Sequence, residues 1–156
     1  MISRFSFAVL CLTASLFWFS SCDKDEPIVP AAEQIEQYLT DNNITGEQTT
    51  SSGLVYLIAE PGASTMPTLS SNITINYEGY RIDGDVFDET EGTPRTFALS
   101  RLISAWQEGI QLIGEGGKIK LICPPNLAYG NNPPSGSKIK AGDVLVFDIE
   151  LLSFSN

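Results

Sequence analysis

Hydrophobic and polar residues alternate along several short segments after residue 53, and this period of two is typical of strands with one buried face. In residues 73–77, for example, Ile73, Ile75 and Tyr77 alternate with polar side chains. Asp83-Gly84 is a turn signal between two such segments. We therefore predict strands at 54–58, 73–77, 86–87, 118–121 and 145–151.

One segment within this strand-rich region has a helical period instead. Ser100 can cap a helix over residues 101–108, and Gly109 can end it in the left-handed conformation. Leu102 and Trp106 are four residues apart, so they would turn one helix face toward the sheet. The sequence therefore predicts an α+β fold, in which an antiparallel β-sheet wraps across one short α-helix.

The residues that precede the sheet divide into a tether, a helix and a loop. Residues 22–30 contain Pro27 and Pro30 and predict an exposed tether. Residues 31–53 predict a helix at 31–41, with Ile35 and Leu39 four apart, and then a loop rich in Asn, Thr, Ser and Gly. A helix of this length is not stable alone, so we expect it to pack on the folded domain or to act as a spacer. The folded domain is expected at residues 54–156.

The first 21 residues have the features of a targeting segment. Arg4 is the only charged residue before Asp23, residues 5–19 are almost wholly apolar, and Ser20-Ser21-Cys22 resembles the lipobox of bacterial lipoproteins. The apolar run is shorter than the roughly 20 residues of a membrane span. We expect a lipoprotein signal peptide at 1–21, a lipid on Cys22, and a protein held by that lipid in the cell envelope, at the outer membrane. The alternative is an ordinary cleaved signal followed by a coincidental cysteine.

The chain is strongly acidic, with 19 acidic and 9 basic residues and a net charge of −10. This charge argues against a nucleic-acid partner and against electrostatic binding to an anionic membrane surface. The acidic run at residues 23–26 resembles the export tag of surface lipoproteins in the Bacteroidetes, and a solvated linker is the alternative.

The residue types exclude most kinds of catalytic site. The chain has no histidine, no cysteine pair at metal-ligand spacing, no nucleophile elbow and no phosphate-binding glycine loop, so we expect neither a metal nor a cofactor. Cys123 alternates with Ile119 and Leu121, and no histidine could activate it, so a buried apolar role is expected. An enzyme with this composition would act by holding and desolvating its substrate.

A series of apolar residues between residues 77 and 147 is typical of a lined pocket. A single aromatic residue on an alternating strand belongs to the core far more often than to a site. However, Phe87-Asp88 follows a turn, and Tyr129 lies in a loop rich in Gly, Asn and Pro, where packing does not require it. The series consists of Tyr77, Phe87, Asp88, Phe97, Leu102, Ile103, Trp106, Tyr129, Ile139 and Phe147.

Four runs of this region, in order, resemble the FK506-binding (FKBP) class of peptidyl-prolyl cis/trans isomerases. The runs are INYEGYRIDGDVFDET (75–90), TPRTFALSRLISAWQEGIQLI (93–113), GGKIKLICPPNLAYG (116–130) and VLVFDIELL (144–152), and from first to last they span about half the chain. The resemblance implies proline-containing polypeptides as substrates and FK506-like macrolides as inhibitors.

The same resemblance implies a role for each residue of the series. Trp106 would form the floor beneath the prolyl ring. The Ile103 N–H and the Tyr129 hydroxyl would bind substrate carbonyls. The other residues would surround the ring, with Tyr77, Phe87, Phe97 and Phe147 as walls, Asp88 beside Tyr77, Leu102 beside Ile103, and Ile139 at the rim.

Several functions stay open at this point. The chain is expected to accelerate Xaa–Pro rotation in envelope or exported proteins, or else to hold proline-containing segments without turnover as a chaperone or adaptor. An inert surface lipoprotein is a third reading. The chain departs from the family at Ser104-Ala105, at Lys140-Ala141 and in the loop 131–137, where substrate side chains would be read. The feature that favours the enzyme is the joint retention of Tyr77, Phe87, Asp88, Ile103, Trp106 and Tyr129.

Overall fold

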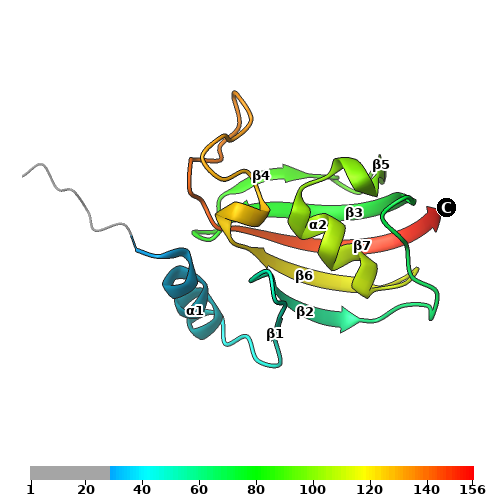
Figure 1. Ribbon diagram of the computed structural model, residues 1–156, viewed down its shortest axis with the longest axis horizontal. Coiled ribbons are helices and arrows are strands. Elements are labelled where there is room, and N and C mark those ends of the chain that lie inside the picture. The colour runs from blue at the N-terminus through cyan, green and yellow to red at the C-terminus, as the bar shows by residue number, and fades with distance from the viewer. Residues whose placement is uncertain (1–28) are drawn as a thin grey trace, which may run out of the picture.

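An antiparallel sheet of seven strands forms the body of the computed structural model, which describes residues 29–156 (Figure 1). The predicted signal peptide, Cys22 and most of the tether lie outside these residues. The strands follow the order β1-β2-β6-β7-β3-β4, and β5 also pairs with β3. Their bounds are β1 Gln48–Thr49, β2 Val55–Glu60, β3 Asn72–Arg81, β4 Val86–Glu89, β5 Arg95–Ala98, β6 Lys118–Cys123 and β7 Leu145–Ser155.

The predicted α+β architecture is confirmed, and the predicted strands are present, although most are longer than their alternating segments. The alternation did not reveal β1, which lies in the expected loop, or β5, which pairs with β3 in a register that places Phe97 opposite Ile73. The turn at Asp83-Gly84 joins β3 to β4, and Gly84 has the positive φ of 92° that such a turn requires.

Helix α2 (Ser104–Gly109) lies across one face of the sheet, between the 3-10 turns η1 (Leu99–Arg101) and η2 (Ile110–Leu112) (Figure 1). The predicted start and stop of this helix were wrong. Leu102 and Ile103 are extended, so the helix begins after them, and no side chain caps it. Gly109 is helical, with φ −70°, and a Cβ there would lie 2.5 Å from the Leu121 side chain. The absence of a side chain at Gly109 therefore permits close packing of α2 against the sheet. It does not end the helix.

A hydrophobic core fills the space between α2 and the sheet. Ile73, Ile75, Leu121 and Leu151 are completely buried in it. Cys123 is also completely buried and unpaired, as its alternation with Ile119 and Leu121 predicted, and burial raises the pKa of its thiol. This core fixes the positions of the strands and the helix that surround the candidate site.

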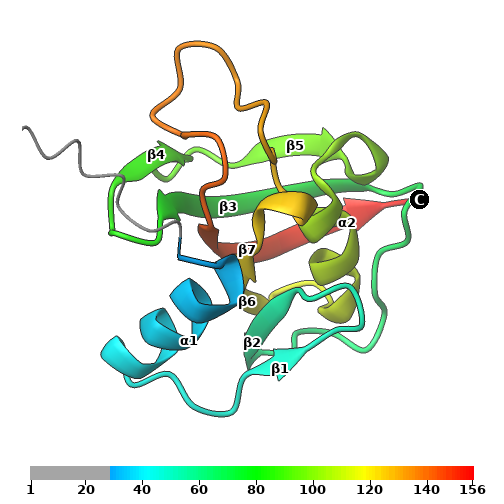
Figure 2. The same cartoon turned by 60° about the vertical axis from the view of Figure 1, so that its left-hand side comes forward.

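Helix α1 (Ala31–Asp41) has the predicted bounds and packs on the opposite face of the sheet (Figure 2). Ile35 is buried in a second hydrophobic cluster with Val55, Ile122 and Val146. The Tyr38 hydroxyl lies 3.3 Å from that of Tyr80 on β3. Of the two expectations for this helix, packing on the domain is therefore the one observed, and the sheet is buried on both faces at this end.

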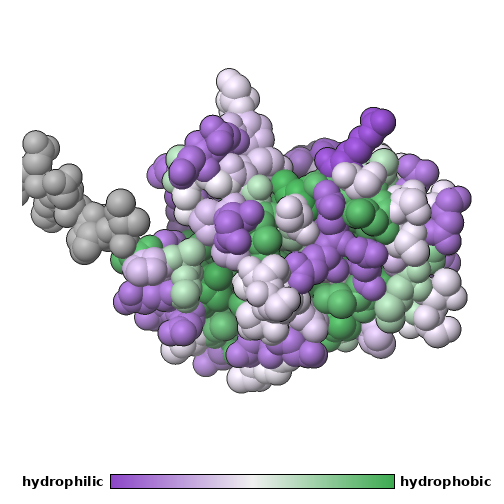
Figure 3. Space-filling view, in the orientation of Figure 1, coloured by the Kyte–Doolittle hydropathy of each residue, from purple (hydrophilic) through white to green (hydrophobic). Residues whose placement is uncertain are grey.

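The surface carries no continuous hydrophobic area on the face that Figure 3 shows, where apolar residues form separate patches among polar ones. Within residues 29–156, no helix has both the length and the hydrophobicity needed to cross a membrane. The segment between η3 (Pro125–Leu127) and β7 stands away from the body of the protein (Figures 1 and 2).

Candidate active site

The predicted site residues come together around a hollow of about 230 Å³ between α2 and the sheet. The lining residues are Tyr77, Phe87, Asp88, Phe97, Arg101, Leu102, Ile103, Trp106, Tyr129 and Phe147. Every member of the predicted series is present except Ile139. That residue is buried in the same hydrophobic core but does not line the hollow, and its role at the rim stays a prediction.

Trp106 lies at the centre of the aromatic lining and is only 5% exposed. Its ring centroid is 5.0 Å from that of Tyr77, 5.2 Å from that of Phe147 and 6.3 Å from that of Phe97. Each of these pairs is edge-to-face, the favoured geometry for aromatic rings. The rings hold one another in place, and the hollow therefore has rigid apolar walls. The indole N–H of Trp106 has no acceptor among the described residues.

Gly79 on β3 makes room for two of these walls. A Cβ built on it would lie 2.8 Å from the Phe147 ring and 2.9 Å from the Phe87 ring. Those two rings pack edge-to-face with their centroids 5.6 Å apart. The strand therefore needs a residue without a side chain at this position, because any other would push the rings into the hollow or away from it.

Three polar side chains form a network at one edge of the hollow. The Tyr77 hydroxyl donates to Asp88 Oδ2. Arg95 Nη1 donates to the Tyr77 hydroxyl at 2.8 Å and to Asp88 Oδ1 at 3.0 Å, and its Nη2 donates to the Glu89 carbonyl at 2.8 Å. Burial, and then the hydrogen bond to Asp88, raises the pKa of Tyr77. The phenol is thus a neutral donor that fixes the Asp88 carboxylate.

Besides the Trp106 indole, two neutral donors at the hollow have no hydrogen-bond partner within residues 29–156. The Ile103 N–H comes immediately before α2 and meets no acceptor within residues 29–156. The Tyr129 hydroxyl likewise has no hydrogen-bond partner in that part of the chain, although its ring lines the hollow. Burial, and then the negative charge of Asp88, raises the pKa of Tyr129, so its hydroxyl keeps its proton. The arrangement offers two neutral donors beside an apolar floor, which suits a ligand that carries carbonyl groups.

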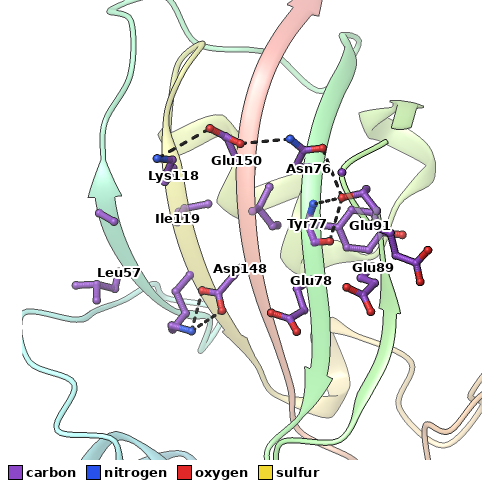
Figure 4. A pocket seen from close by; sticks show the side chains of 15 residues that line it. Leu57, Asn76, Tyr77, Glu78, Glu89, Glu91, Lys118, Ile119, Asp148 and Glu150 are labelled. Carbon is purple, nitrogen blue, oxygen red and sulfur yellow. Dashed lines mark hydrogen bonds and ion pairs between the residues drawn. The ribbon is translucent and has the colours of Figure 1, made fainter. Parts of the chain in front are cut away.

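A larger hollow of about 610 Å³ lies on the outer face of the sheet (Figure 4). Its polar side chains largely satisfy one another: Lys120 pairs with Asp148 at 2.7 Å, and Asn76 donates to Glu150 at 3.3 Å. Tyr77 is the one residue of the predicted series that borders it. The outer hollow is therefore a solvated sheet face, and the chemistry predicted from the sequence belongs to the smaller one. No three His, Cys, Asp or Glu side chains within 29–156 are grouped so as to hold a metal ion.

A sequence profile described as "FKBP-type peptidyl-prolyl cis-trans isomerase" matches residues 63–152, which include every residue that lines the smaller hollow. The chain belongs to this family. The FKBP-type resemblance inferred from the four sequence runs is thus confirmed, and the fold around the site is the one that the family implies.

Relatives and solved structures agree with this assignment. The FkpA isomerase of Escherichia coli is 46% identical over 109 residues, which make up 69% of this chain and 40% of that protein. The Mip isomerase of Coxiella burnetii is 38% identical over 125 residues, 78% of this chain and 54% of that protein. This FKBP-type chain therefore spans about half the length of the curated relatives it matches.

The structural comparison gives the same fold. The crystal structure of E. coli FkpA superposes with a TM-score of 0.71 at 40% identity, and the match covers 80% of this chain and 58% of that one. A peptidyl-prolyl cis-trans isomerase from Pseudomonas syringae matches with a TM-score of 0.68 at 26% identity, covering 82% of this chain and 98% of that one.

Sequence reasoning missed three residues of this FKBP-type site, namely Gly79, Arg95 and Arg101. For two of them the sequence held a signal. A glycine inside an alternating strand marks a close approach, as Gly79 does. Arg95 is two residues before Phe97, so a period of two places both on the same face of β5. For Arg101 no such signal exists, because its position at the hollow depends on the unpredicted turn η1.

Proposed function

We propose that this chain is a peptidyl-prolyl cis/trans isomerase that works at the hollow over Trp106. The observation that carries the proposal is the combination of a rigid aromatic pocket with two unpartnered neutral donors, the Ile103 N–H and the Tyr129 hydroxyl. A pocket of 230 Å³ suits a prolyl ring and its immediate backbone. Proline-containing polypeptides are the substrates, and macrolides of the FK506 type are the inhibitors.

The pocket would lower the barrier to rotation by desolvating the amide. Rotation about an Xaa–Pro amide faces a barrier of ~18–20 kcal/mol and takes tens to hundreds of seconds unaided. The planar amide carries more charge separation than the twisted one, so loss of water disfavours the planar ground state more. Such a difference between ground and transition state is what accelerates a reaction.

The two donors would hold the backbone on either side of the rotating bond. A carbonyl bound by the Ile103 N–H and another bound by the Tyr129 hydroxyl leave the prolyl ring over Trp106. No proton passes to a protein base in this scheme, which is consistent with a chain that contains no histidine. Asp88 is held by Tyr77 and Arg95, and its charge lies at the pocket edge rather than beneath the ring.

An isomerisation assay on the purified protein tests this function. We expect acceleration of cis/trans exchange in a Leu-Pro peptide, and loss of that acceleration when an FK506-type macrolide is added. Binding of the peptide without any acceleration would instead assign the pocket to a non-catalytic module that holds proline-containing segments. If the protein neither binds the peptide nor accelerates its isomerisation, this pocket does not carry the proposed function.

We further propose that a lipid on Cys22 anchors this domain in the cell envelope, at the outer membrane, where its substrates are envelope or exported proteins. The support is the sequence alone: the apolar run 5–19, the lipobox-like Ser20-Ser21-Cys22, and an acidic chain without a basic membrane-binding patch. Lipid attachment would suit such a chain, because its net charge of −10 opposes electrostatic binding to anionic lipids.

A further inference from the structure

Arg101 is a rim residue of the pocket to which the proposed reaction gives no role. It ends turn η1, it is one of the residues that line the pocket, and it is exposed. The backbone on both sides of it is held by one side chain, because Gln107 Nε2 donates to the Leu102 carbonyl at 2.7 Å and to the Ser100 carbonyl at 3.3 Å. The guanidinium therefore extends from a fixed point at the pocket mouth.

The charge of Arg101 is uncompensated within the described chain. Asp88 is the only other acidic or basic residue of the lining, and its carboxylate is paired with Arg95 at 3.0 Å. No ion pair of Arg101 occurs within residues 29–156. The pocket mouth thus presents one free positive charge, in a protein whose net charge is −10.

We propose that Arg101 determines substrate preference, and that the pocket favours peptides with a carboxylate side chain next to the proline. This inference rests on the proposed function, since it names the substrate class of the same site. A Glu or Asp beside the proline would lie at the pocket mouth while the prolyl ring occupies the floor. Its carboxylate would then meet the only cation among the lining residues, which has no ion-pair partner within residues 29–156, and a guanidinium binds a carboxylate with well-matched geometry.

The net negative charge of the protein and the local charge of Arg101 should act in opposite directions on an acidic peptide. A net charge of −10 repels acidic peptides, so without Arg101 a Glu-containing peptide should be a poorer substrate than its Gln counterpart. With Arg101, the local pair should reverse that order. An exposed ion pair supports a preference of about two- to fivefold at low ionic strength, and high salt should reduce it.

The experiment compares matched peptides that carry Glu or Gln immediately before the proline, and a second pair with Glu or Gln immediately after it. For each pair, kcat/KM and the dissociation constant are measured at low salt and in 1 M NaCl, roughly a tenfold change in ionic strength from ordinary buffer. The wild-type protein should prefer Glu by about two- to fivefold in at least one pair. Arg101→Gln should bring that ratio below one, and Arg101→Lys should retain part of the preference.

Lys140→Gln is the matched control, because it removes one positive charge from an exposed site outside the pocket. It should leave the Glu-to-Gln ratio unchanged. A wild-type protein without preference in either pair would overturn the inference, and so would an unchanged preference in Arg101→Gln. The proposed function has its own negative outcome, which is that the protein accelerates isomerisation of neither the Glu nor the Gln peptides. In that case the dissociation constants still decide whether Arg101 selects carboxylates.

Discussion

Gly79 on β3 lies directly against the ring of Phe147 on β7, so closely that a Cβ on Gly79 would be 2.8 Å from it. The two residues also face each other across the strand pairing of β3 and β7. The backbone of one strand thus forms the surface on which a wall of the pocket rests. The shape of the pocket depends on a missing side chain as much as on the rings themselves.

Gly79→Ala should therefore damage both the fold and the pocket. The extra methyl group must displace Phe147 or Phe87, and overpacking of this kind typically costs about 1–3 kcal/mol in the free energy of unfolding. Affinity for a prolyl peptide should fall as well, because the displaced rings change the walls. Urea denaturation and peptide titration measure the two effects. As a control, Glu78→Ala alters the residue before Gly79 in β3, which is exposed, and should leave the affinity unchanged. Normal peptide affinity in Gly79→Ala would mean that these rings do not shape the site.

Arg95→Gln should lower kcat/KM while leaving stability nearly unchanged. The substitution removes the cation that joins Tyr77, Asp88 and the Glu89 carbonyl, so the Asp88 carboxylate loses its neutralising charge and keeps only the Tyr77 hydroxyl as a donor. The pair is half exposed, with both side chains 46% accessible, and ion pairs this exposed contribute little to the free energy of unfolding. Arg95→Lys should restore only part of the activity, because an ammonium lacks the planar fork that reaches several acceptors.

Lys118→Gln provides the control for Arg95. It breaks an ion pair with Glu60 that is similarly exposed but lies away from the pocket. Both substitutions should therefore have similar effects on stability, and only Arg95→Gln should change kcat/KM. If Lys118→Gln reduces catalysis to the same extent, the effect is one of net charge and not of the Tyr77–Asp88–Arg95 network.

Tyr129→Phe separates a role in binding from a role in packing. The hydroxyl has no partner within residues 29–156, so its removal should hardly change the melting temperature. If it binds a substrate carbonyl, affinity should fall about two- to tenfold, the equivalent of one hydrogen bond. Tyr56→Phe is the control, since that hydroxyl donates to Gln48 at 3.0 Å outside the pocket. A lower melting temperature with unchanged affinity would assign Tyr129 to the core.

Stability should fall as the pH rises above 10, because the phenols of Tyr77, which is buried, and Tyr80, which is partly buried, resist ionisation. Burial raises the pKa of Tyr77 and of Tyr80, with further contributions from Asp88 and from Tyr38 respectively. In the unfolded chain these phenols ionise near 10, so above that pH the unfolded state loses protons that the folded state keeps. The stabilisation is complete below pH 10 and is lost progressively above it.

Denaturation curves at pH 9, 10 and 11 test this expectation. Each tyrosine contributes a slope of up to about 1.4 kcal/mol per pH unit. Tyr80→Phe should therefore show a shallower decline than the wild-type protein, even if its stability at pH 9 is lower. An identical slope in Tyr80→Phe would show that other groups cause the alkaline loss of stability.

The strands that could be predicted from the sequence are those in which apolar and polar residues alternate. Alternation in segments such as 73–77 arises wherever a strand buries one face and exposes the other to solvent. The strands that meet this condition were therefore predicted. At the end of the sheet that α1 covers, the alternation gives way to a continuous apolar run formed by Val144, Leu145, Val146 and Phe147. Such a run signals burial on both faces, and it was the available sign that α1 packs against the sheet.

The parts of the site that could not be predicted depend on tertiary contacts. The extended pair Leu102-Ile103 delays the start of α2, so the Ile103 N–H does not receive the cap expected from Ser100 and meets no acceptor within residues 29–156. Arg95 reaches Asp88 only because β4 and β5 both pair with β3. Neither relationship follows from spacing along the chain. The aromatic lining was predicted more fully, because those residue types carry the family resemblance themselves.

The proposed lipid anchor makes the last prediction, and it concerns Cys22. An acyl chain contributes about 0.8 kcal/mol per buried methylene, and stable anchoring requires more than one chain. A di- or triacylated Cys22 would therefore hold this acidic domain at a membrane without a basic patch. Metabolic labelling with palmitate should mark the wild-type protein but not Cys22→Ala, and Cys22→Ala should stay unprocessed or become soluble. Cys123→Ala is the matched control and should still be labelled, because that buried thiol has no part in anchoring. Unlabelled wild-type protein in the soluble fraction, with its mature start elsewhere than Cys22, would make this domain a freely diffusing exported protein instead.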